Sequence, residues 1–374
     1  MSTEPTVAPP AVRAFSRAAD LPRADWAELL RPEDLFLGER WLAVAERTAG
    51  SPMRYLLLDE DGRTVAGLAT ALADDTAPWV LGRPDTMLRA AAEAGREGAA
   101  EILAALPASP AESLLPTLVC GGRHMGRSRV PRLAGTGRDQ VEALVAEAER
   151  LAAERGAASV AYPFVEDGDT LLRQILGERG YAHHDSGRYS SLRVGPGGFD
   201  EYLTLVSARR RRRILTERRR VREAGIELRI EPLSAGLVPR LGVLEAELMA
   251  KYGHTWTAGQ TEQVLHEMIA AFGADAQVAL AVGDGDIRGF GTLLRFGSHW
   301  YARQAGFDYA YQDRLPLYFE TLYYFPVEAA ARFGIEAIHY GLGSEEAKLS
   351  RGCTAETQHS YLLPLTRPSR NTHV

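Results

Sequence analysis

The chain has 374 residues and a formal net charge of −6, a length that exceeds one ordinary hydrophobic core and suits two domains. Apolar residues make up 45% and charged residues 25% of the chain, which is a globular composition, and no apolar run is long enough to span a bilayer. The acidic balance argues against a protein whose whole surface binds nucleic acid, but it leaves room for a local basic patch.

Two cysteines, Cys120 and Cys353, are the only ones in the chain. They are too few for a disulfide framework or for a cysteine-based metal centre. The N-terminus is rich in Pro and Ala and has no signal-type apolar core. We therefore expect a cytoplasmic protein without a metal site, with a disordered tail at residues 1–12 and a second tail at residues 367–374.

The first half of the chain alternates segments of helical and of strand character. An amphipathic helix that begins at Leu35 precedes a hairpin whose turn is Asp61-Gly62. Gly156 and Gly180 each stand at the end of a predicted helix. In chain order we expect strands at 54–58 and 65–71, a helix at 87–106, a strand at 114–120, a helix at 139–155, a strand at 159–164, a helix at 169–179 and a strand at 189–194.

The second half repeats this order after a turn-rich linker, Gly195-Pro196-Gly197-Gly198. Gly225 stands where a helix ends, and Pro316 stands where another begins. In chain order we expect a helix at 207–224, a strand at 226–230, helices at 237–252 and 261–272, strands at 277–282, 287–296 and 299–305, a helix at 317–333, and strands at 337–340 and 358–363.

The two halves end on the same series of features. Each has a helix that stops at a glycine, an alternating strand that contains a tyrosine, a polar loop and a further glycine. This indicates duplication of a whole domain rather than a short-period repeat. We predict an α+β fold with two tandem domains, residues 13–195 and 196–366, each a mixed central sheet flanked by helices. A splay between two central strands would admit a ligand.

The most unusual local segment is residues 207–225, which hold nine arginines and two glutamates in an acidic protein. Five consecutive arginines, 209–213, cover every face of a helix, so at least one must point toward the domain body and needs an anionic partner. We predict that Arg209, Arg212 and Arg213 bind phosphate or carboxylate groups of a substrate. The alternative is a solvated helix in a chain that uses arginine almost throughout.

The second unusual segment follows the strand that ends at Tyr340. Lys348 lies in it and is one of only two lysines among 43 basic residues, the other being Lys251. A lysine, unlike an arginine, can lose its proton or act as a compact charge. Glu345 and Arg351 bring further charge to this strand end, where open sheets place ligands. The alternative is a salt-bridged helix start.

The two segments resemble the Fem-like branch of the GNAT acyltransferase superfamily, whose members are often described as peptidoglycan-biosynthesis-like. The likeness extends over residues 199–363 and is only architectural in the first half. It implies tandem GNAT-like domains and transfer of an acyl or aminoacyl group to an amine. The matching residues in the first segment are Arg212, Arg213, Glu217, Arg219 and Gly225. In residues 318–362, which include the second segment and the helix and strand before it, they are Glu320, Tyr323, Tyr324, Pro326, Glu328, Gly334, Gly341, Lys348, Arg351 and Gly352.

The resemblance also implies a place for the donor. GNAT proteins hold the pyrophosphate of acyl-CoA with backbone N–H groups of a glycine-containing loop at a helix N-terminus. Residues 307–318 of the second half contain no such glycines. In the first half Arg123, Gly126 and Ser128 match the loop in part and are the predicted cofactor-binding residues. We expect no tightly bound cofactor, with acyl-CoA or aminoacyl-tRNA as a co-substrate and residues 207–222 as the contact for tRNA.

We therefore predict an N-acyltransferase or aminoacyltransferase that forms an amide bond in cell-wall or small-metabolite biosynthesis. Catalysis would rest on positioning the donor, holding the oxyanion and removing a proton from a small-molecule or peptide amine. Glu320 is the predicted base, and Lys348 and Tyr324 are the other catalytic candidates. The substrate-binding candidates beside the three arginines are Arg303, Tyr323, Tyr340 and Arg351.

The alternative is a protein that keeps the tandem fold without chemistry. Its arginine helix would then bind RNA or another polyanion, and binding would weaken steeply with salt. An amide product would distinguish the two hypotheses.

Overall fold

The computed structural model describes residues 11–77, 83–121, 126–312 and 315–365. The chain forms two compact units, the first from residues 1–189 and 356–374 and the second from residues 190–355. Each unit combines helices with a mixed sheet, which confirms the predicted α+β class. None of the described helices has both the length and the apolar content that crossing a membrane requires.

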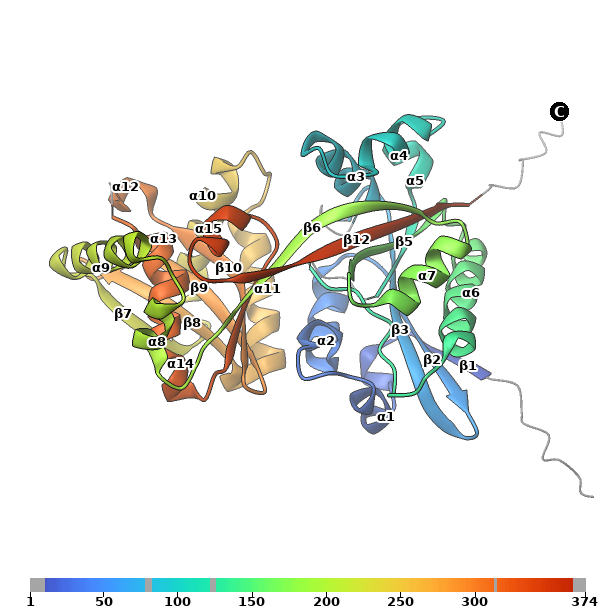
Figure 1. Ribbon diagram of the computed structural model, residues 1–374, viewed down its shortest axis with the longest axis horizontal. Coiled ribbons are helices and arrows are strands. Elements are labelled where there is room, and N and C mark those ends of the chain that lie inside the picture. The colour runs from blue at the N-terminus through green and yellow to red at the C-terminus, as the bar shows by residue number, and fades with distance from the viewer. Residues whose placement is uncertain (1–10, 78–82, 122–125, 313–314, 366–374) are drawn as a thin grey trace, which may run out of the picture. The chain divides into compact units, whose positions relative to one another are not determined.

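The first unit contains most of the elements of the first half, shown in Figure 1. They are β1 (Ala11–Phe15), α1 (Arg23–Glu28), α2 (Glu39–Thr48), β2 (Met53–Glu60), β3 (Arg63–Ala73), α3 (Pro84–Glu93), α4 (Ala99–Ala105), α5 (Pro110–Leu114), β4 (Thr117–Cys120), α6 (Arg138–Glu154), β5 (Ser159–Glu166), α7 (Thr170–Glu178), β6 (Ala182–Arg193) and, from the end of the chain, β12 (Thr354–Pro364). The strand order is β1-β2-β3-β4-β5-β12-β6.

Side-chain alternation along β2 explains how this sheet holds helices on both faces. Leu56 and Leu58 belong to one apolar cluster, which includes the inner stripe of α6. Tyr55 and Leu57 point the other way and belong to a cluster with residues of α1 and α2. Successive residues of a strand face opposite sides of the sheet, so a strand that is apolar at every position fits between two helical layers.

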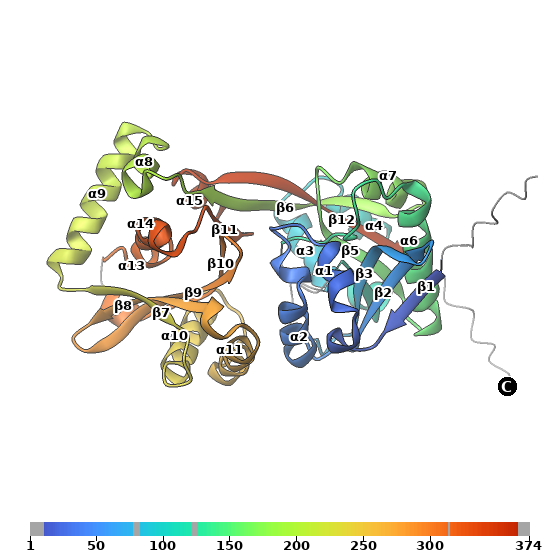
Figure 2. The ribbon, with the colours of Figure 1, turned by 90° about the horizontal axis from the view of Figure 1, so that it is seen from below.

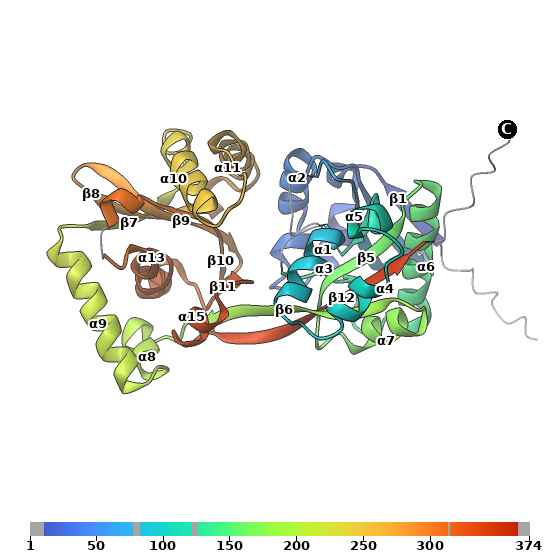
Figure 3. The same ribbon diagram turned by 90° about the horizontal axis from the view of Figure 1, so that it is seen from above.

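The second unit repeats the arrangement with other helices. Its elements are α8 (Gly198–Thr204), α9 (Ala208–Glu223), β7 (Glu227–Pro232), α10 (Val238–Lys251), α11 (Ala258–Phe272), β8 (Ala276–Gly283), β9 (Asp286–Phe296), β10 (His299–Phe307), α12 (Tyr309–Gln312), α13 (Leu317–Phe319), a π-helical turn (Glu320–Tyr324), α14 (Phe325–Ala330), β11 (Ala337–Gly341) and α15 (Glu345–Leu349). The strand order is β6-β11-β10-β9-β8-β7. Figures 2 and 3 show α13 and α14 on one face of β8 and β9, and α10 and α11 on the other.

In each unit, the strand that pairs antiparallel with the second strand of the parallel pair comes from the other half of the sequence. Strand β12 pairs antiparallel with β5, with Leu362 opposite Ala161. Residues 190–193 of β6 pair antiparallel with β11, with Leu192 opposite Ile338. The expected domains, 13–195 and 196–366, placed residues 358–363 in the second domain, whereas the structure places them in the first unit. The sequence alone did not reveal this exchange of strands between the two units, because two apolar strands of similar pattern can pair with either sheet.

Both units contain a central pair of parallel strands that separate. In the first unit β4 and β5 are paired from Thr117↔Ser159 to Val119↔Ala161. In the second, β10 and β11 are paired from His299↔Ala337 to Tyr301↔His339. Beyond these residues the strands no longer pair with each other, as expected for the predicted splay.

Several predicted elements differ from the structure; the strand expected at 189–194, for example, begins at Ala182. Of the tail expected at 1–12, Ala11 and Val12 begin β1, while the rest and residues 367–374 lie outside the described residues. The helix expected at 87–106 is two helices, because Gly95 and Gly98 take positive φ values of 65° and 79°, which end a helix. The strand expected at 114–120 begins only at Thr117, after α5. Pro326 does not divide the helix at 317–333; a π turn lies just before it.

Candidate functional site

Helix α9 carries a carboxylate into the interior of the second unit. The Ser207 hydroxyl accepts a hydrogen bond from the Arg210 N–H at 3.3 Å and caps the helix. The buried stripe of the helix is Ile214, Glu217 and Val221, at the three- and four-residue spacing of an amphipathic helix. A glutamate in this stripe needs partners, since a buried charge is costly when unpaired.

The π turn faces this helix. All five of its residues, Glu320–Tyr324, are buried. The turn brings Glu320 beside Arg218 of α9, and Tyr324 beside Glu217 of the same helix. Single π turns inside helices are rare and occur frequently at functional sites.

Glu320 is 1% exposed. Its two carboxylate oxygens have different hydrogen-bond partners. Oε1 accepts a hydrogen bond from Nε of Arg218 at 2.9 Å, while Oε2 has no hydrogen-bond partner among the described residues. Arg218 also donates to Oε2 of Glu328 at 2.6 Å. Burial raises the pKa of Glu320, and the Arg218 guanidinium opposes that rise. A buried carboxylate with a raised pKa, one of whose oxygens has no hydrogen-bond partner among the described residues, suits a general base.

A second buried network joins α9 to the π turn and to the residues after α15. The Tyr324 hydroxyl donates to Oε2 of Glu217 at 2.6 Å and accepts from Nε of Arg351 at 3.1 Å. Oε1 of Glu217 accepts from Nε of Arg213 at 2.8 Å. Arg351 is 2% exposed, and its guanidinium carbon lies 3.3 Å from the ring centroid of Phe319. Burial raises the pKa of Tyr324, so this phenol stays protonated and holds the carboxylate.

Lys348 is buried and uses all its donors within the protein. Its ammonium group donates to the carbonyl oxygens of Tyr340, Gly341 and Leu342 at 2.8, 2.9 and 2.7 Å. Burial lowers its pKa to about 8, whereas three carbonyl acceptors favour the protonated form. The lysine holds the chain at the end of β11, and contact with a reacting oxygen would require it to release one of these carbonyls. Its catalytic role stays a prediction.

The two predicted tyrosines lie at the same place, and Arg303 does not. The rings of Tyr323 and Tyr340 stack with centroids 4.5 Å apart, and the Tyr340 hydroxyl has no hydrogen-bond partner among the described residues. Arg303 on β10 interacts instead with Glu245 of α10, and burial lowers its pKa to about 10. We call the residues brought together the π-turn cluster: Glu217, Glu320, Tyr323, Tyr324, Tyr340 and Arg351.

The other predicted arginines lie on the solvent side of α9. Arg209, Arg212 and Arg213 are exposed, and only Arg213 has an ion-pair partner, Glu217, among the described residues. Arg209 and Arg213 line a surface hollow of about 220 Å³ with Ser207 and Arg210. Within the run 209–213, the inward contact predicted for at least one arginine is made by Arg211, whose Nε donates to the Leu203 carbonyl at 2.8 Å.

The candidate cofactor loop of the first unit is described only in part. Arg123 lies outside the described residues. Gly126 has a φ of 127°, which favours glycine. The Ser128 N–H donates to the Phe164 carbonyl at 3.0 Å, so this amide is already engaged. Helix α6 begins only at Arg138, ten residues further along the chain, and its N-terminus is therefore not adjacent in sequence to the loop.

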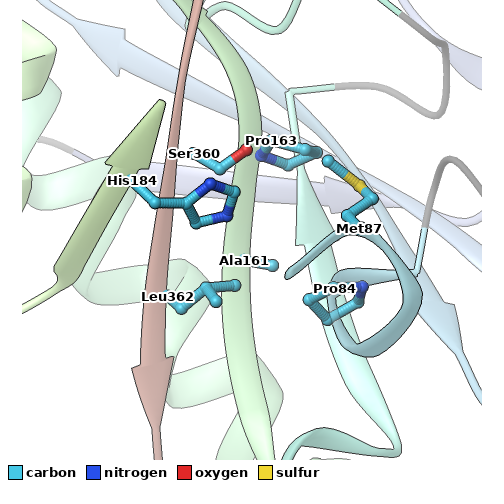
Figure 4. A pocket seen from close by; sticks show the side chains of 7 residues that line it. All are labelled: Pro84, Met87, Ala161, Pro163, His184, Ser360 and Leu362. Atoms are coloured by element: carbon cyan, nitrogen blue, oxygen red, sulfur yellow. The ribbon is translucent and has the colours of Figure 1, made fainter. Parts of the chain in front are cut away.

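One small cavity lies inside the first unit. Figure 4 shows His184 and Ser360, from β6 and β12, facing Pro84 and Met87 of α3. The cavity holds about 10 Å³, which is room for about one water molecule. It is therefore too small for an acyl donor.

Sequence reasoning missed Arg218 as a member of the site. Arg218 is one of nine arginines on a single helix, and no feature of the run distinguishes it. The one available signal was its position, four residues after the buried Ile214 and beside Glu217.

Comparisons with known proteins identify the family and the fold. A family model, FemAB_like, described as peptidoglycan biosynthesis/recognition, matches residues 119–369, which is more than half of the chain. A search of curated proteins found no significant match.

Three solved structures show the fold. The crystal structure of FemX has a TM-score of 0.62 at 12% identity and covers 92% of this chain and 96% of that one. A tandem GNAT protein from the clavulanic acid biosynthesis pathway has a TM-score of 0.54 at 12% identity, with 96% and 100% covered. A conserved protein of unknown function from Bacteroides thetaiotaomicron has a TM-score of 0.54 at 12% identity, with 92% and 98% covered. The chain therefore belongs to the FemAB-like family and has a tandem GNAT fold.

Proposed function

We propose that this protein forms an amide bond between an activated acyl or aminoacyl donor and an amine, and that Glu320 takes the proton of the amine. Membership of the FemAB-like family and the tandem GNAT fold support the class of reaction. The single observation that carries the assignment is the Glu320 carboxylate, which is 1% exposed and keeps one oxygen without a hydrogen-bond partner among the described residues. A buried polar atom without a partner needs an explanation, and a substrate amine supplies one.

The reaction needs no covalent intermediate on the protein. The amine nitrogen attacks the carbonyl carbon of the donor, a C–N bond forms, and the bond from that carbon to the donor oxygen or sulfur breaks. Glu320 takes the proton that the nitrogen loses and passes it to the departing alkoxide or thiolate, directly or through water, which restores the carboxylate. Such proton transfer contributes about 10²- to 10⁴-fold to a rate.

The neighbouring residues would hold this base in place. Arg218 donates a hydrogen bond to Oε1 of Glu320, and Oε2 has no hydrogen-bond partner among the described residues. Tyr324 and Arg351, hydrogen-bonded to each other, brace the π turn against Glu217. Lys348 fixes the backbone at the end of β11. We therefore assign Arg218, Arg351 and Lys348 as positioning residues, and Glu320 alone as the catalytic base.

We infer that the donor is an aminoacyl-tRNA rather than an acyl-CoA. Exposed arginine side chains, Arg209 and Arg212, are available for phosphates, and arginine suits phosphate recognition. The alternative loop for CoA has its Ser128 amide engaged with Phe164. The acceptor follows from the family description, which points to an amine of a peptidoglycan precursor.

The test is a product assay with the full chain. Labelled aminoacyl-tRNA and labelled acyl-CoA are each incubated with a peptidoglycan precursor peptide that carries a free amine. We expect an amide product with aminoacyl-tRNA and loss of that product in Glu320→Gln. The matched control is Glu328→Gln, which removes the half-exposed partner of the same arginine and should retain product formation. Product from acyl-CoA alone would overturn the choice of donor, and salt-dependent tRNA binding without any product would favour a polyanion-binding protein.

A further inference from the structure

The first unit contains a histidine-rich cluster that the proposed reaction does not use. His183 and Asp185 lie two residues apart on β6, and His359 lies on the neighbouring strand β12. Residues two apart on a strand share a face. The intervening residues, His184 and Ser360, point the other way, into the cavity of Figure 4. Three side chains that can bind a metal therefore meet on one face of the sheet.

The three ligand atoms have the spacing of a metal site. Nε2 of His183 lies 2.9 Å from Nδ1 of His359. Oδ1 of Asp185 lies 3.1 Å from the same Nδ1 and 3.8 Å from Nε2 of His183. The point equidistant from these three atoms is about 2 Å from each of them, which is the length of a zinc–nitrogen or zinc–oxygen bond. The three atoms lie close enough together for one ion to contact all of them.

A further carboxylate orients the central histidine. Nε2 of His359 lies 2.9 Å from Oδ1 of Asp167, and Nδ1 lies 3.1 Å from Oδ1 of Asp185. A metal ion on Nδ1 requires the tautomer whose proton is on Nε2, and Asp167 accepts a hydrogen bond from that tautomer. Metal-binding histidines usually donate their second ring N–H to a carboxylate in this way. Arg173 pairs with Asp167 at 2.5 Å and with the Tyr361 hydroxyl at 3.2 Å, and its charge is thereby offset by Asp167.

The cluster is also open to solvent on one side. The side chains of His183 and Asp185 are 38% and 30% exposed, whereas that of His359 is 7% exposed. A water molecule can complete four-coordination at the exposed side, as in sites with three protein ligands. Two imidazoles and one carboxylate suit zinc better than magnesium or calcium, which prefer oxygen ligands.

We propose that His183, Asp185 and His359 form a zinc site in the first unit, with Asp167 orienting His359. The ion would join β12 to β6, two strands whose ligands are 176 residues apart in sequence. A cross-link between such distant segments stabilises a fold by restricting the unfolded chain. The site is independent of the π-turn cluster, so its loss would leave the proposed transferase reaction in place.

Zinc titration of the full chain tests the proposal. The protein is prepared without a histidine tag, stripped with a chelator and titrated with Zn²⁺ against a chromophoric competitor, and its unfolding temperature is followed. We expect one Zn²⁺ per chain and a higher unfolding temperature with zinc. His183→Ala removes a partly exposed ligand and should weaken binding at least about 100-fold, and Asp167→Asn about tenfold, the range measured for carboxylates behind metal ligands.

The matched control is His266→Ala, which removes an exposed histidine of α11 and should leave the affinity unchanged. Circular dichroism without zinc checks that His183→Ala is folded. Equal zinc affinity in the parent and in folded His183→Ala would overturn the proposal, and so would the absence of stoichiometric binding by the parent.

Discussion

Two glutamates, Glu166 in the first unit and Glu320 in the second, show what separates the units. Glu166 is partly buried and Glu320 is fully buried. Glu166 ends β5 of the first unit, and both its oxygens face arginines, Arg127 and Arg31, each at 3.2 Å. In the second unit, Oε1 of Glu320 lies 2.9 Å from Nε of Arg218, and Oε2 has no hydrogen-bond partner among the described residues. Burial raises the pKa of both carboxyl groups.

The two carboxylates therefore differ mainly in the partners of their oxygens. The loop that follows β4 contains Arg127 and Arg129, which form ion pairs with Glu166 and Asp34 of the same unit. A carboxylate whose two oxygens both have arginine partners has a structural role. A carboxylate with one unpaired oxygen can still accept a hydrogen bond or a proton from a substrate. The same strand arrangement thus holds a carboxylate with two arginine partners in the first unit and a carboxylate with one unpaired oxygen, among the described residues, in the second.

The largest effect on stability should come from removing one partner of a buried ion pair in the first unit. Arg129 and Asp34 form a buried ion pair, 2% and 3% exposed. Arg129→Met leaves Asp34 buried without its partner, so we expect a loss of about 3–5 kcal/mol in the free energy of unfolding. Urea unfolding measures it. Arg63→Ala, which breaks an exposed pair with Glu28, is the control and should cost at most about 1 kcal/mol. Equal effects of the two substitutions would break the comparison.

The next effect concerns the two lysines. Lys348→Met leaves three buried carbonyl oxygens without a donor, so we expect a loss of about 2–4 kcal/mol in the free energy of unfolding. Lys348→Arg should not restore it, because a planar guanidinium cannot direct three N–H groups to one tripod of oxygens. Lys251, exposed with its ammonium 3.9 Å from the Tyr309 ring centroid, is the control, and Lys251→Met should cost about 1 kcal/mol or less. An unchanged urea midpoint in Lys348→Met would show that this lysine is free for chemistry.

A pH profile sharpens the contrast at Glu320. The carboxylate must be ionised to accept a proton, so kcat/KM should fall as the pH falls through its raised pKa. Arg218 lowers this pKa, and Arg218→Gln should therefore displace the acid limb to higher pH by at least about one pH unit. Arg219→Gln removes an exposed arginine paired with Glu223 and should leave the limb in place. A limb that moves to lower pH, or does not move, would argue against Glu320 as the base.

The smallest effect should come from the outer face of α9. The Arg209→Ala/Arg212→Ala double variant should raise the KM for aminoacyl-tRNA several-fold and leave kcat unchanged. The slope of log affinity against log salt should fall by about 0.7–0.9 for each phosphate that no longer has an arginine partner. Arg63→Ala, which removes an exposed arginine of the first unit, is the control. An unchanged salt slope would place the tRNA elsewhere.

The sequence predicted the elements better than the partners. Apolar periodicity and helix-ending glycines located most helices and strands, because both are local signals. The exchange of β6 and β12 between the units is not local, and neither is the meeting of His183 with His359. Glu320, Tyr324 and Arg351 were predicted from their resemblance to a family, and the structure brings them together with Glu217.

Charge compensation was the least predictable feature. Arg218 could not be told from its eight neighbours on α9, because their difference is the direction of the side chain. Lys348 was predicted as a catalytic residue, and the structure shows that its three donors are used by backbone carbonyls, which the sequence did not indicate. A sequence shows which residues carry charge, but their partners follow from the packing of distant segments.

The most direct test of the comparison substitutes each glutamate by its amide. Single-turnover amide formation is measured for Glu320→Gln and Glu166→Gln with the same aminoacyl-tRNA and amine, and each rate is divided by the fraction of folded protein. We predict that Glu320→Gln lowers the rate by about 10²- to 10⁴-fold and that Glu166→Gln leaves the rate per folded molecule unchanged. A full rate in Glu320→Gln, or an equal loss in Glu166→Gln, would contradict the assignment of the chemistry to the second unit.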